Sequence, residues 1–328
     1  VTVPDVLKDR IALKKTAQQL NVVYFLGSDT EPVPDYERRL SELLLYLQQF
    51  YGREMQRHGY GARSFGLDIK SPGRVNIIEY KAKNPAAHYP YENGGGWKAA
   101  QELEEFFKAN PDRKKSQHTL VIMPTWNDEK NGPDNPGGVP FYGMGRNCFA
   151  LDYPAFDIKH LGQKTREGQL LTKWYGGLAH ELGHAFHDQQ VFTHPLICQE
   201  YSMPVAETAS TFNEVLTVTA AIQAAQDKDE KLALIESQLS DACQIICDIY
   251  SRFLFESSVF EARPQEFLDA DRLCQLMLEA QKKAYGDGLD QTCLHPYMWL
   301  CKGHYYSGSL SFYNFPYAFG GLFARGLY

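Results

Sequence analysis

The chain has 328 residues, of which 44% are hydrophobic and 13% aromatic, enough to bury one large core or two moderate ones. Its formal net charge of -7 argues against a broad surface for nucleic acid. No run of 18 apolar residues exists, so the sequence predicts neither a membrane-spanning segment nor a membrane partner.

The first half of the chain alternates between strand and helix patterns. Apolar, β-prone runs at 22–27, 74–80 and 118–126 predict strands. Leucines and aromatic residues at helical spacing predict helices over 35–58 and 96–110. This alternation predicts a twisted, at least partly parallel sheet that is flanked by helices.

The segment that follows combines a loop and a strand pattern. Residues 127–139 are rich in Gly, Pro, Asn and Asp, which is typical of a solvated turn or a lid. Their acids could hold a cation, but they lack the residue order of an EF-hand; they are Asp128, Glu129 and Asp134. Residues 141–153 predict an edge strand in front of the next helix.

The second half changes to almost unbroken helix. Helical periodicity covers 205–226, 229–262 and 264–286. The sequence therefore predicts a sheet-containing part followed by a mainly helical part.

Cysteine usage bears on the cellular compartment. The seven cysteines form no CxxC pair and their number is odd, which favours reduced thiols and a cytoplasmic location. Residues 1–15 lack the order of a secretory signal; since the chain begins at Val1 and not at a methionine, a processing boundary there is the alternative. The sequence indicates no oligomeric state.

One short stretch carries chemistry, "AHELGHAFHDQQ" at 179–190. Four residues of an α-helix turn through about 400°, so His180 and His184 project from one face, roughly 6 Å apart along the axis. That separation suits two imidazoles on one tetrahedral zinc ion, with Glu181 beside them to hold a water. The alternative is three polar residues that only share a helix.

A third ligand distinguishes the classes of zinc site. The extension HExxHxxGxxH would need Gly at 187 and His at 190, but the chain has His187 and Gln190. A carboxylate from the next helix is the other solution, and Glu207 follows His184 by 23 residues. Glu200, in a loop, is the competing candidate.

The other polar residues near the motif are weaker candidates for a role at the metal site. His187 faces nearly the same way as His184 and fits a packed or supporting histidine, and His194 fits a structural one. Asp188 and Glu214 are candidates for orienting the ligand histidines.

Three separated motifs together carry a family resemblance. They are "LAHELGHAFHDQQ" at 178–190, "EYSMPVAETASTFNEVL" at 200–216 and "HYYSGSLSFYNFPYAFGGLFARGLY" at 304–328. In this order they resemble the oligoendopeptidase F branch of the thimet oligopeptidase family of zinc peptidases. The resemblance covers residues 174–328 and not the N-terminal half.

The resemblance implies a role for each matching residue. His180, His184 and Glu207 would bind one zinc ion, and Glu181 would be the catalytic base. His304 and a nearby tyrosine would hold the substrate carbonyl and stabilise the oxyanion. For the tyrosine the matching segment offers Tyr313 and Tyr317, with Tyr305 and Tyr306 close by; the alternative is an aromatic packing loop.

The chain also departs from the family pattern. Residues 1–173 do not show the family's mainly helical N-terminal region, and family members continue beyond "ARGLY". We therefore expect a shortened or recombined peptidase.

These observations predict an α+β, zincin-like fold. A mixed α/β sheet lobe, 1–173, would contain the substrate edge strand, and a helical catalytic lobe, 174–328, would contain the HExxH motif and the glutamate ligand, with the active-site cleft between the lobes. The predicted function is hydrolysis of peptide substrates by a metal-activated water, with Glu181 as general base. The alternatives are a catalytically silent, zinc-stabilised binding module and a zinc hydrolase of non-peptide amides.

Overall fold

The computed structural model forms two compact units, Val1–Gln199 and Glu200–Tyr328. The predicted functional division between residues 173 and 174 stays a prediction. The acidic loop with Asp128, Glu129 and Asp134 lies outside the described residues. The structure describes residues 10–16, 18–90, 94–124, 141–144, 146–161, 163, 165–191, 193–225, 227–308 and 310–327.

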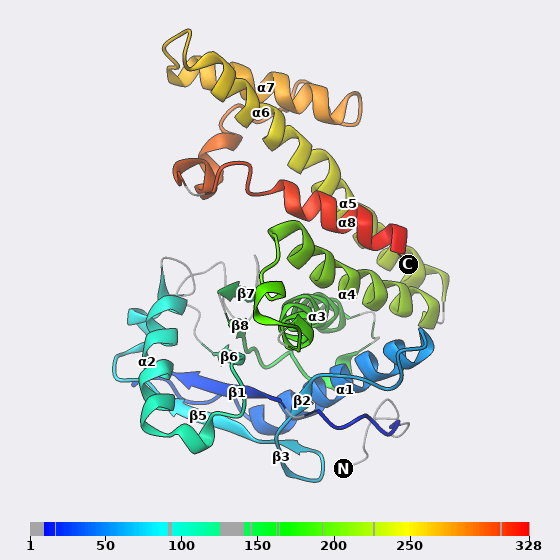
Figure 1. Ribbon diagram of the computed structural model, residues 1–328. Coiled ribbons are helices and arrows are strands. Elements are labelled where there is room, and N and C mark those ends of the chain that lie inside the picture. Colours follow the sequence, from blue (N-terminus) through cyan, green and yellow to red (C-terminus); the bar gives the residue numbers. More distant parts are fainter. Residues whose placement is uncertain are drawn as a thin grey trace. The chain divides into compact units, whose positions relative to one another are not determined.

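The first unit alternates strands and helices, as its sequence predicts (Figure 1). Its strands are β1 (Gln19–Leu26), β2 (Gly66–Leu67), β3 (Ile69–Ser71), β4 (Arg74–Val75), β5 (Ile77–Lys81), β6 (Thr119–Met123), β7 (Phe141–Met144) and β8 (Asn147–Leu151). Its α-helices are α1 (Tyr36–Arg57), α2 (Gly95–Ala109) and α3 (Arg166–Val191). Short 3-10 turns cover Ala86–His88, Pro111–Arg113, Ile158–His160 and Leu196–Cys198.

The main sheet has the strand order β2-β1-β6-β8-β7, and β5 also pairs with β1. The pairs β1–β5, β1–β6 and β6–β8 are parallel, so the predicted partly parallel sheet is confirmed. β7 pairs antiparallel with β8 and ends the strand order. The predicted edge strand over 141–153 is thus two antiparallel strands, because the chain reverses between Met144 and Asn147.

A closed core lies around this sheet. The β1 and β6 side chains are buried along nearly their whole length, which is typical of parallel strands covered on both faces. From α1, Leu40, Leu43 and Leu44 are fully buried.

A buried arginine joins α1 to the segment that leads into α3. Arg39 donates to both carboxylate oxygens of Asp152, at 3.0 and 2.9 Å, and to the carbonyl oxygens of Tyr153 and Phe156. Because the buried charge has this many partners, the ion pair fixes one chain path. The chain that follows β8 is therefore held against α1.

The second unit is helical, as predicted. It contains α4 (Met203–Ala224), α5 (Lys228–Cys243), a π-helical turn (Gln244–Asp248), α6 (Ile249–Ala262), α7 (Ala270–Tyr285), 3-10 turns at Met298–Cys301 and Gly303–Tyr306, and α8 (Phe315–Leu327). α4 packs against α8, and α6 packs against α7 (Figure 1). A small core of Phe255, Leu276, Met277 and Ala280 joins α6 to α7.

One predicted helix boundary is wrong. The helix expected over 264–286 begins only at Ala270, because Asp269 caps it by accepting a hydrogen bond from the Arg272 N–H at 2.8 Å. Residues 264–268 precede this cap and are not helical.

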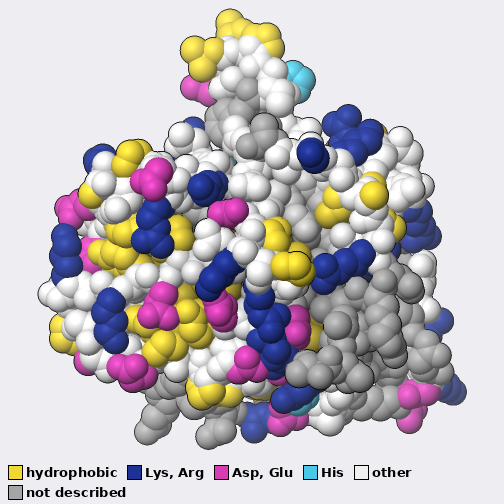
Figure 2. Space-filling view, turned by 90° about the horizontal axis from the view of Figure 1, so that it is seen from below, with side chains coloured by type: hydrophobic (Ala, Val, Ile, Leu, Met, Phe, Trp, Pro, Cys, Tyr) yellow, Lys and Arg dark blue, Asp and Glu magenta, His cyan; other side chains and the backbone are white. Residues whose placement is uncertain are grey.

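Surface features agree with the composition. On the face drawn in Figure 2, Lys and Arg side chains are interspersed with Asp and Glu side chains. All seven cysteines are free thiols; Cys148 is buried, whereas Cys198, Cys243, Cys293 and Cys301 are exposed. Among the described helices, none is both long and apolar enough to span a bilayer.

Candidate metal centre and active site

Helix α3 directs apolar side chains toward the core and the two histidines of the motif away from it. Thr165 caps it by accepting a hydrogen bond from the Gly168 N–H at 3.2 Å. Leu178 and Leu182 face the core, at 1% and 0% exposure. Two residues further along a helix is a turn of about 200°, so the histidines at 180 and 184 project away from that core.

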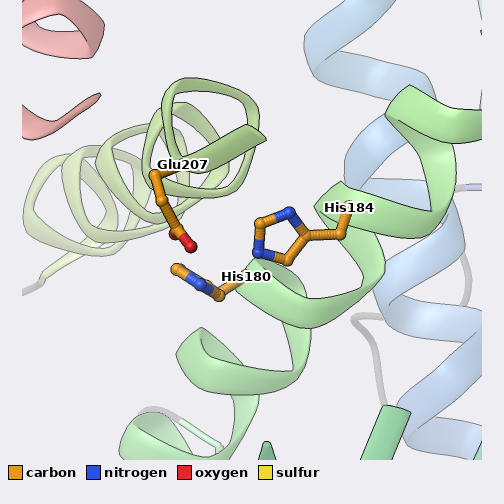
Figure 3. A group of neighbouring side chains, drawn as sticks. All are labelled: His180, His184 and Glu207. Atoms are coloured by element: carbon orange, nitrogen blue, oxygen red, sulfur yellow. The ribbon is translucent and has the colours of Figure 1, made fainter. Parts of the chain in front are cut away.

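The two histidines and Glu207 come together (Figure 3). The rings of His180 and His184 lie with centroids 5.1 Å apart, and the planes meet at 82°. One ligand atom from each histidine and one from Glu207 all lie within 4.8 Å of one another. Figure 3 shows the carboxylate directed toward the imidazoles.

This donor set fits a zinc ion. Ligand atoms about 2.0 to 2.1 Å from a tetrahedral ion lie about 3.4 Å apart, so small side-chain adjustments would close the group. Two imidazoles and one carboxylate also leave the fourth position open, which is typical of catalytic rather than structural sites.

The environment keeps the second histidine ready to bind a cation. The pKa of His184 is lowered to about 4, mainly by burial and then by His180 and His187, while Asp188 opposes the change. A neutral imidazole is the form that binds metal, so protons compete little for His184 at neutral pH.

Glu181 lies next to the first ligand and contacts a thiol. Glu181 is 8% exposed, and Cys148 Sγ on β8 lies 3.7 Å from its Oε2. Burial, together with the Glu181 carboxylate, raises the pKa of the Cys148 thiol. The thiol therefore stays protonated and donates a weak hydrogen bond that holds the carboxylate.

Two further contacts hold α3 at the motif. The buried Tyr51 hydroxyl donates to the carbonyl oxygen of Ala179 at 2.6 Å, one residue before His180. His118 Nε2 lies 3.0 Å from Asp188 Oδ2. Asp188, a predicted orienting residue, thus contacts His118, and its role toward the ligands stays a prediction.

Glu207 is positioned inside the second unit. It is 3% exposed, and the fully buried Ser210 hydroxyl lies 3.0 Å from its Oε2 and 3.0 Å from its carbonyl oxygen. A hydroxyl this close can donate to the carboxylate and reduce its freedom to rotate.

The competing candidates lie elsewhere. Glu200 and His194 are exposed and are not members of the ligand group among the described residues. His187 is partly buried and Glu214 is partly buried on α4. Burial also lowers the pKa of His187.

The C-terminal segment brings two of its four candidate tyrosines together. The hydroxyls of Tyr313 and Tyr317 lie 3.1 Å apart, and the Tyr313 ring centroid is 6.2 Å from that of His304. Tyr305 packs on Phe255 and its ring centroid is 4.3 Å from that of His304, whereas Tyr306 is 62% exposed. The paired hydroxyls keep Tyr313 and Tyr317 as the candidates.

Helix α6 anchors this segment. Glu256 accepts a hydrogen bond from the Phe312 N–H at 2.9 Å, and Arg252 Nη1 donates to Asn314 Oδ1 at 2.9 Å. Phe312 has a φ of 56°, a conformation that is rare for a large side chain and that needs such support. Burial, with the charges of Arg252 and Lys302, lowers the pKa of His304 and keeps its imidazole neutral.

The sequence alone did not single out these supporting residues. Cys148 fits an ordinary thiol, and Tyr51 and Ser210 fit ordinary helix positions. Only the tertiary contacts show that Cys148 touches Glu181 and that Ser210 touches Glu207.

Part of the chain matches a known protein family. The profile of Peptidase family M3 matches residues 170–325, the range that contains both histidines, Glu181 and Glu207. Residues 170–325 are therefore similar to this family. The predicted resemblance to oligoendopeptidase F is thereby confirmed for this M3 region.

The relatives of the M3 region are bacterial oligopeptidases. The chain is 30% identical over 162 residues to the chromosomal oligoendopeptidase F of Lactococcus lactis subsp. cremoris, covering 46% of this chain and 26% of that protein. It is 28% identical over 147 residues to the group B oligopeptidase PepB of Streptococcus agalactiae serotype III, strain NEM316, covering 44% and 24%. The chain thus spans about a quarter of the length of the curated relatives it matches.

The chain also resembles a solved structure. It is 94% identical to wild type OgpA from Akkermansia muciniphila, covering 57% of this chain and 53% of that one, with a TM-score of 0.54. A catalytically inactive OgpA in complex with an O-glycopeptide (glycodrosocin) substrate matches at 92% identity over the same 57%. Since 57% of 328 residues is about 187 and the second unit has 129, this likeness includes part of the first unit.

Proposed function

We propose that the chain is a zinc-dependent metallopeptidase of the HExxH plus Glu type. The convergence of His180, His184 and Glu207 beside Glu181 carries the proposal. The match of residues 170–325 to Peptidase family M3 supports peptide-bond hydrolysis as the reaction.

Each residue has a defined task in this proposal. His180, His184 and Glu207 hold one Zn²⁺, which when bound supplies Lewis-acid activation of water and of the scissile carbonyl. Glu181 takes a proton from the attacking water and passes it to the leaving amine. Cys148 holds the Glu181 carboxylate in place through its S–H.

The C-terminal segment would stabilise the oxyanion. His304 and one of the two paired tyrosines, Tyr313 or Tyr317, would donate hydrogen bonds to it, each contributing roughly 3 kcal/mol in comparable sites. The neutral state of His304 suits this task, because a neutral imidazole keeps one N–H donor.

The substrate would bind as an extra strand. β7 ends the strand order and so offers an edge to an extended peptide, whose main chain would form hydrogen bonds with it. In the zincin-like arrangement that we propose, the sheet lobe and the helical lobe lie on either side of the substrate cleft.

O-glycosylated peptides are the first substrates to test. A structure that is 92% identical to part of this chain contains an O-glycopeptide substrate. We therefore propose peptides with an O-glycan as substrates, with unmodified peptides as the comparison. The odd number of free cysteines supports a reducing, cytoplasm-like setting.

The decisive variant is Glu181→Gln. It keeps the size of the side chain and removes the base, so turnover should fall by about 10²- to 10⁴-fold while zinc content stays unchanged. Cleavage of matched peptides with and without an O-glycan, read by mass spectrometry, measures turnover. Glu167→Gln on the same helix is the control and should retain both activity and zinc. Full activity of Glu181→Gln would refute the base assignment.

Two other functions remain as rivals. In a silent binding module the zinc ion would be structural, and chelation would unfold the chain; in the proposed enzyme chelation abolishes cleavage with only modest unfolding. For a hydrolase of non-peptide amides, the peptides would stay intact while a simple amide was cleaved.

A further inference from the structure

A glycine of α8 lies directly against the backbone of the candidate ligand Glu207. A Cβ atom added to Gly320 would come within 2.7 Å of both the carbonyl carbon and the carbonyl oxygen of Glu207, and within 2.9 Å of the Thr208 nitrogen. Ordinary van der Waals contact begins near 3.4 Å. The two helix backbones are therefore in contact only because residue 320 has no side chain.

The contact cannot be relieved by a side-chain rotation. All three nearby atoms belong to the α4 backbone, so one helix would have to move by about 0.7 Å, the difference between 3.4 and 2.7 Å. A glycine inside a helix costs about 1 kcal/mol relative to alanine. The close packing of α8 against α4 therefore explains why residue 320 is a glycine.

The other two glycines of α8 differ from Gly320. A Cβ on Gly321 would meet side-chain atoms, Ile245 Cγ2 at 3.2 Å and Arg325 Nη1 at 3.4 Å. A Cβ on Gly326 would meet nothing within 4 Å. Among these three positions, only Gly320 touches the backbone at a candidate metal ligand.

The same contact joins two parts of the candidate site. Tyr317 lies one helical turn before Gly320 on α8, and its hydroxyl is 3.1 Å from that of Tyr313. On the α4 side, Ser210 is within hydrogen-bond distance of the Glu207 carboxylate. The metal ligand and the candidate oxyanion tyrosine thus lie on helices that meet at residue 320.

We propose that Gly320 is a positioning residue for the metal centre. It fixes the Glu207 backbone against the helix that carries Tyr317, while Ser210 fixes the carboxylate of the same residue. The inference rests on the proposed function, because that function assigns Glu207 to the metal.

Zinc affinity of the full chain tests the role of Gly320. It is measured by competition with a chromophoric chelator, without any substrate. Gly320→Ala should bind zinc about 10- to 100-fold more weakly, as supporting-residue changes around metal sites do. Gly326→Ala, the matched control on the same helix, should stay within about twofold of the wild type.

A double-mutant cycle shows whether the effect passes through Glu207. If it does, Gly320→Ala should cause no further loss of zinc affinity when Glu207→Gln is already present. An equal loss in both backgrounds would mean a general structural effect and would overturn the proposal. Because kcat depends on how precisely the catalytic groups are placed, the kcat of Gly320→Ala should fall more than its KM rises.

The remaining outcomes separate this inference from the proposed function. A wild-type chain that binds no zinc removes both. A wild type that binds zinc, with Gly320→Ala binding it equally well, removes the inference alone. If Gly320→Ala does not fold, Ser210→Ala decides, because it adds no atom: a loss of about 3- to 10-fold supports the proposal, and unchanged affinity overturns it.

Discussion

The two units of the chain differ in how completely they bury their apolar side chains. Among the described residues, five large exposed apolar side chains belong to the first unit and twenty to the second. The first unit has fully buried strands, whereas the α6–α7 core of the second unit has four buried residues. Exposed apolar surface of this extent marks interaction surfaces or low local stability.

The candidate ligands therefore have unequal support. His180 and His184 are on α3, whose core-facing residues are packed in the first unit, and Tyr51 and Trp174 tie that helix by hydrogen bonds to Ala179 and Leu151. Glu207 depends on contacts within the second unit. We therefore expect the carboxylate ligand to be the more easily displaced one.

Hydrogen exchange should give the largest contrast between the units. Backbone amides of β1 and β6 should exchange at least about 10²-fold more slowly than those of α7, because opening the first unit exposes a closed core. Mass spectrometry of peptides after timed deuteration measures this. Equal protection in β1 and α7 would contradict the comparison.

A matched pair of leucines tests the two cores. Leu43→Ala removes a fully buried side chain and should lower the free energy of unfolding by about 4 kcal/mol, whereas Leu276→Ala should cost about 2 kcal/mol. Denaturant unfolding followed by circular dichroism measures both. A larger loss for Leu276→Ala would reverse the order of the two cores.

The stability of the first unit should depend on the ionisation of one buried carboxylate. Burial favours neutral Asp157, but Arg38 at 2.7 Å and the Lys159 N–H at 3.1 Å outweigh it and lower its pKa. Since the folded pKa lies below the unfolded one, the stabilisation is complete above about pH 5 and is lost as pH falls through the folded value. Asp157→Asn should cost about 2 kcal/mol at about pH 7, and the difference should vanish in strong acid. A difference that is constant with pH would exclude the ionic role.

The smallest effect is expected at an exposed phenylalanine of the second unit. Phe267 is 90% exposed, so Phe267→Ser should change the free energy of unfolding by less than about 0.5 kcal/mol. Binding of a dye specific for apolar surface should fall in parallel. A loss of stability above about 1 kcal/mol would show that Phe267 is packed in solution.

The sequence predicted elements better than contacts. The strand expected at 22–27 and the helix at 35–58 match β1 and α1 within a few residues, because apolar runs and helical spacing are local signals. The π-helical turn at Gln244–Asp248 leaves no such signal, since the apolar residues continue through it. The helix start at Ala270 does have a local signal, because Asp269 is a favourable cap, but helical spacing alone predicts an earlier start.

Some residues of the candidate site can likewise be predicted from local sequence, whereas others are found only from tertiary contacts. His180, His184 and Glu181 follow from a motif whose spacing fixes their direction on one helix. Cys148 could not be predicted, because its contact with Glu181 depends on where β8 lies relative to α3. Gly320 did leave a signal, a glycine inside an apolar helix, but its neighbour Glu207 is visible only in three dimensions.

The distribution of thiols provides a chemical reporter for opening of the sheet in the first unit. Cys198, Cys243, Cys293 and Cys301 are exposed, whereas Cys148 is buried on β8. A maleimide reagent should therefore label these four exposed cysteines of the native chain within minutes and leave Cys148 unlabelled. The rate of Cys148 alkylation then reports the rate at which the sheet opens. The mass of the one tryptic peptide that contains Cys148 is enough to follow this reaction.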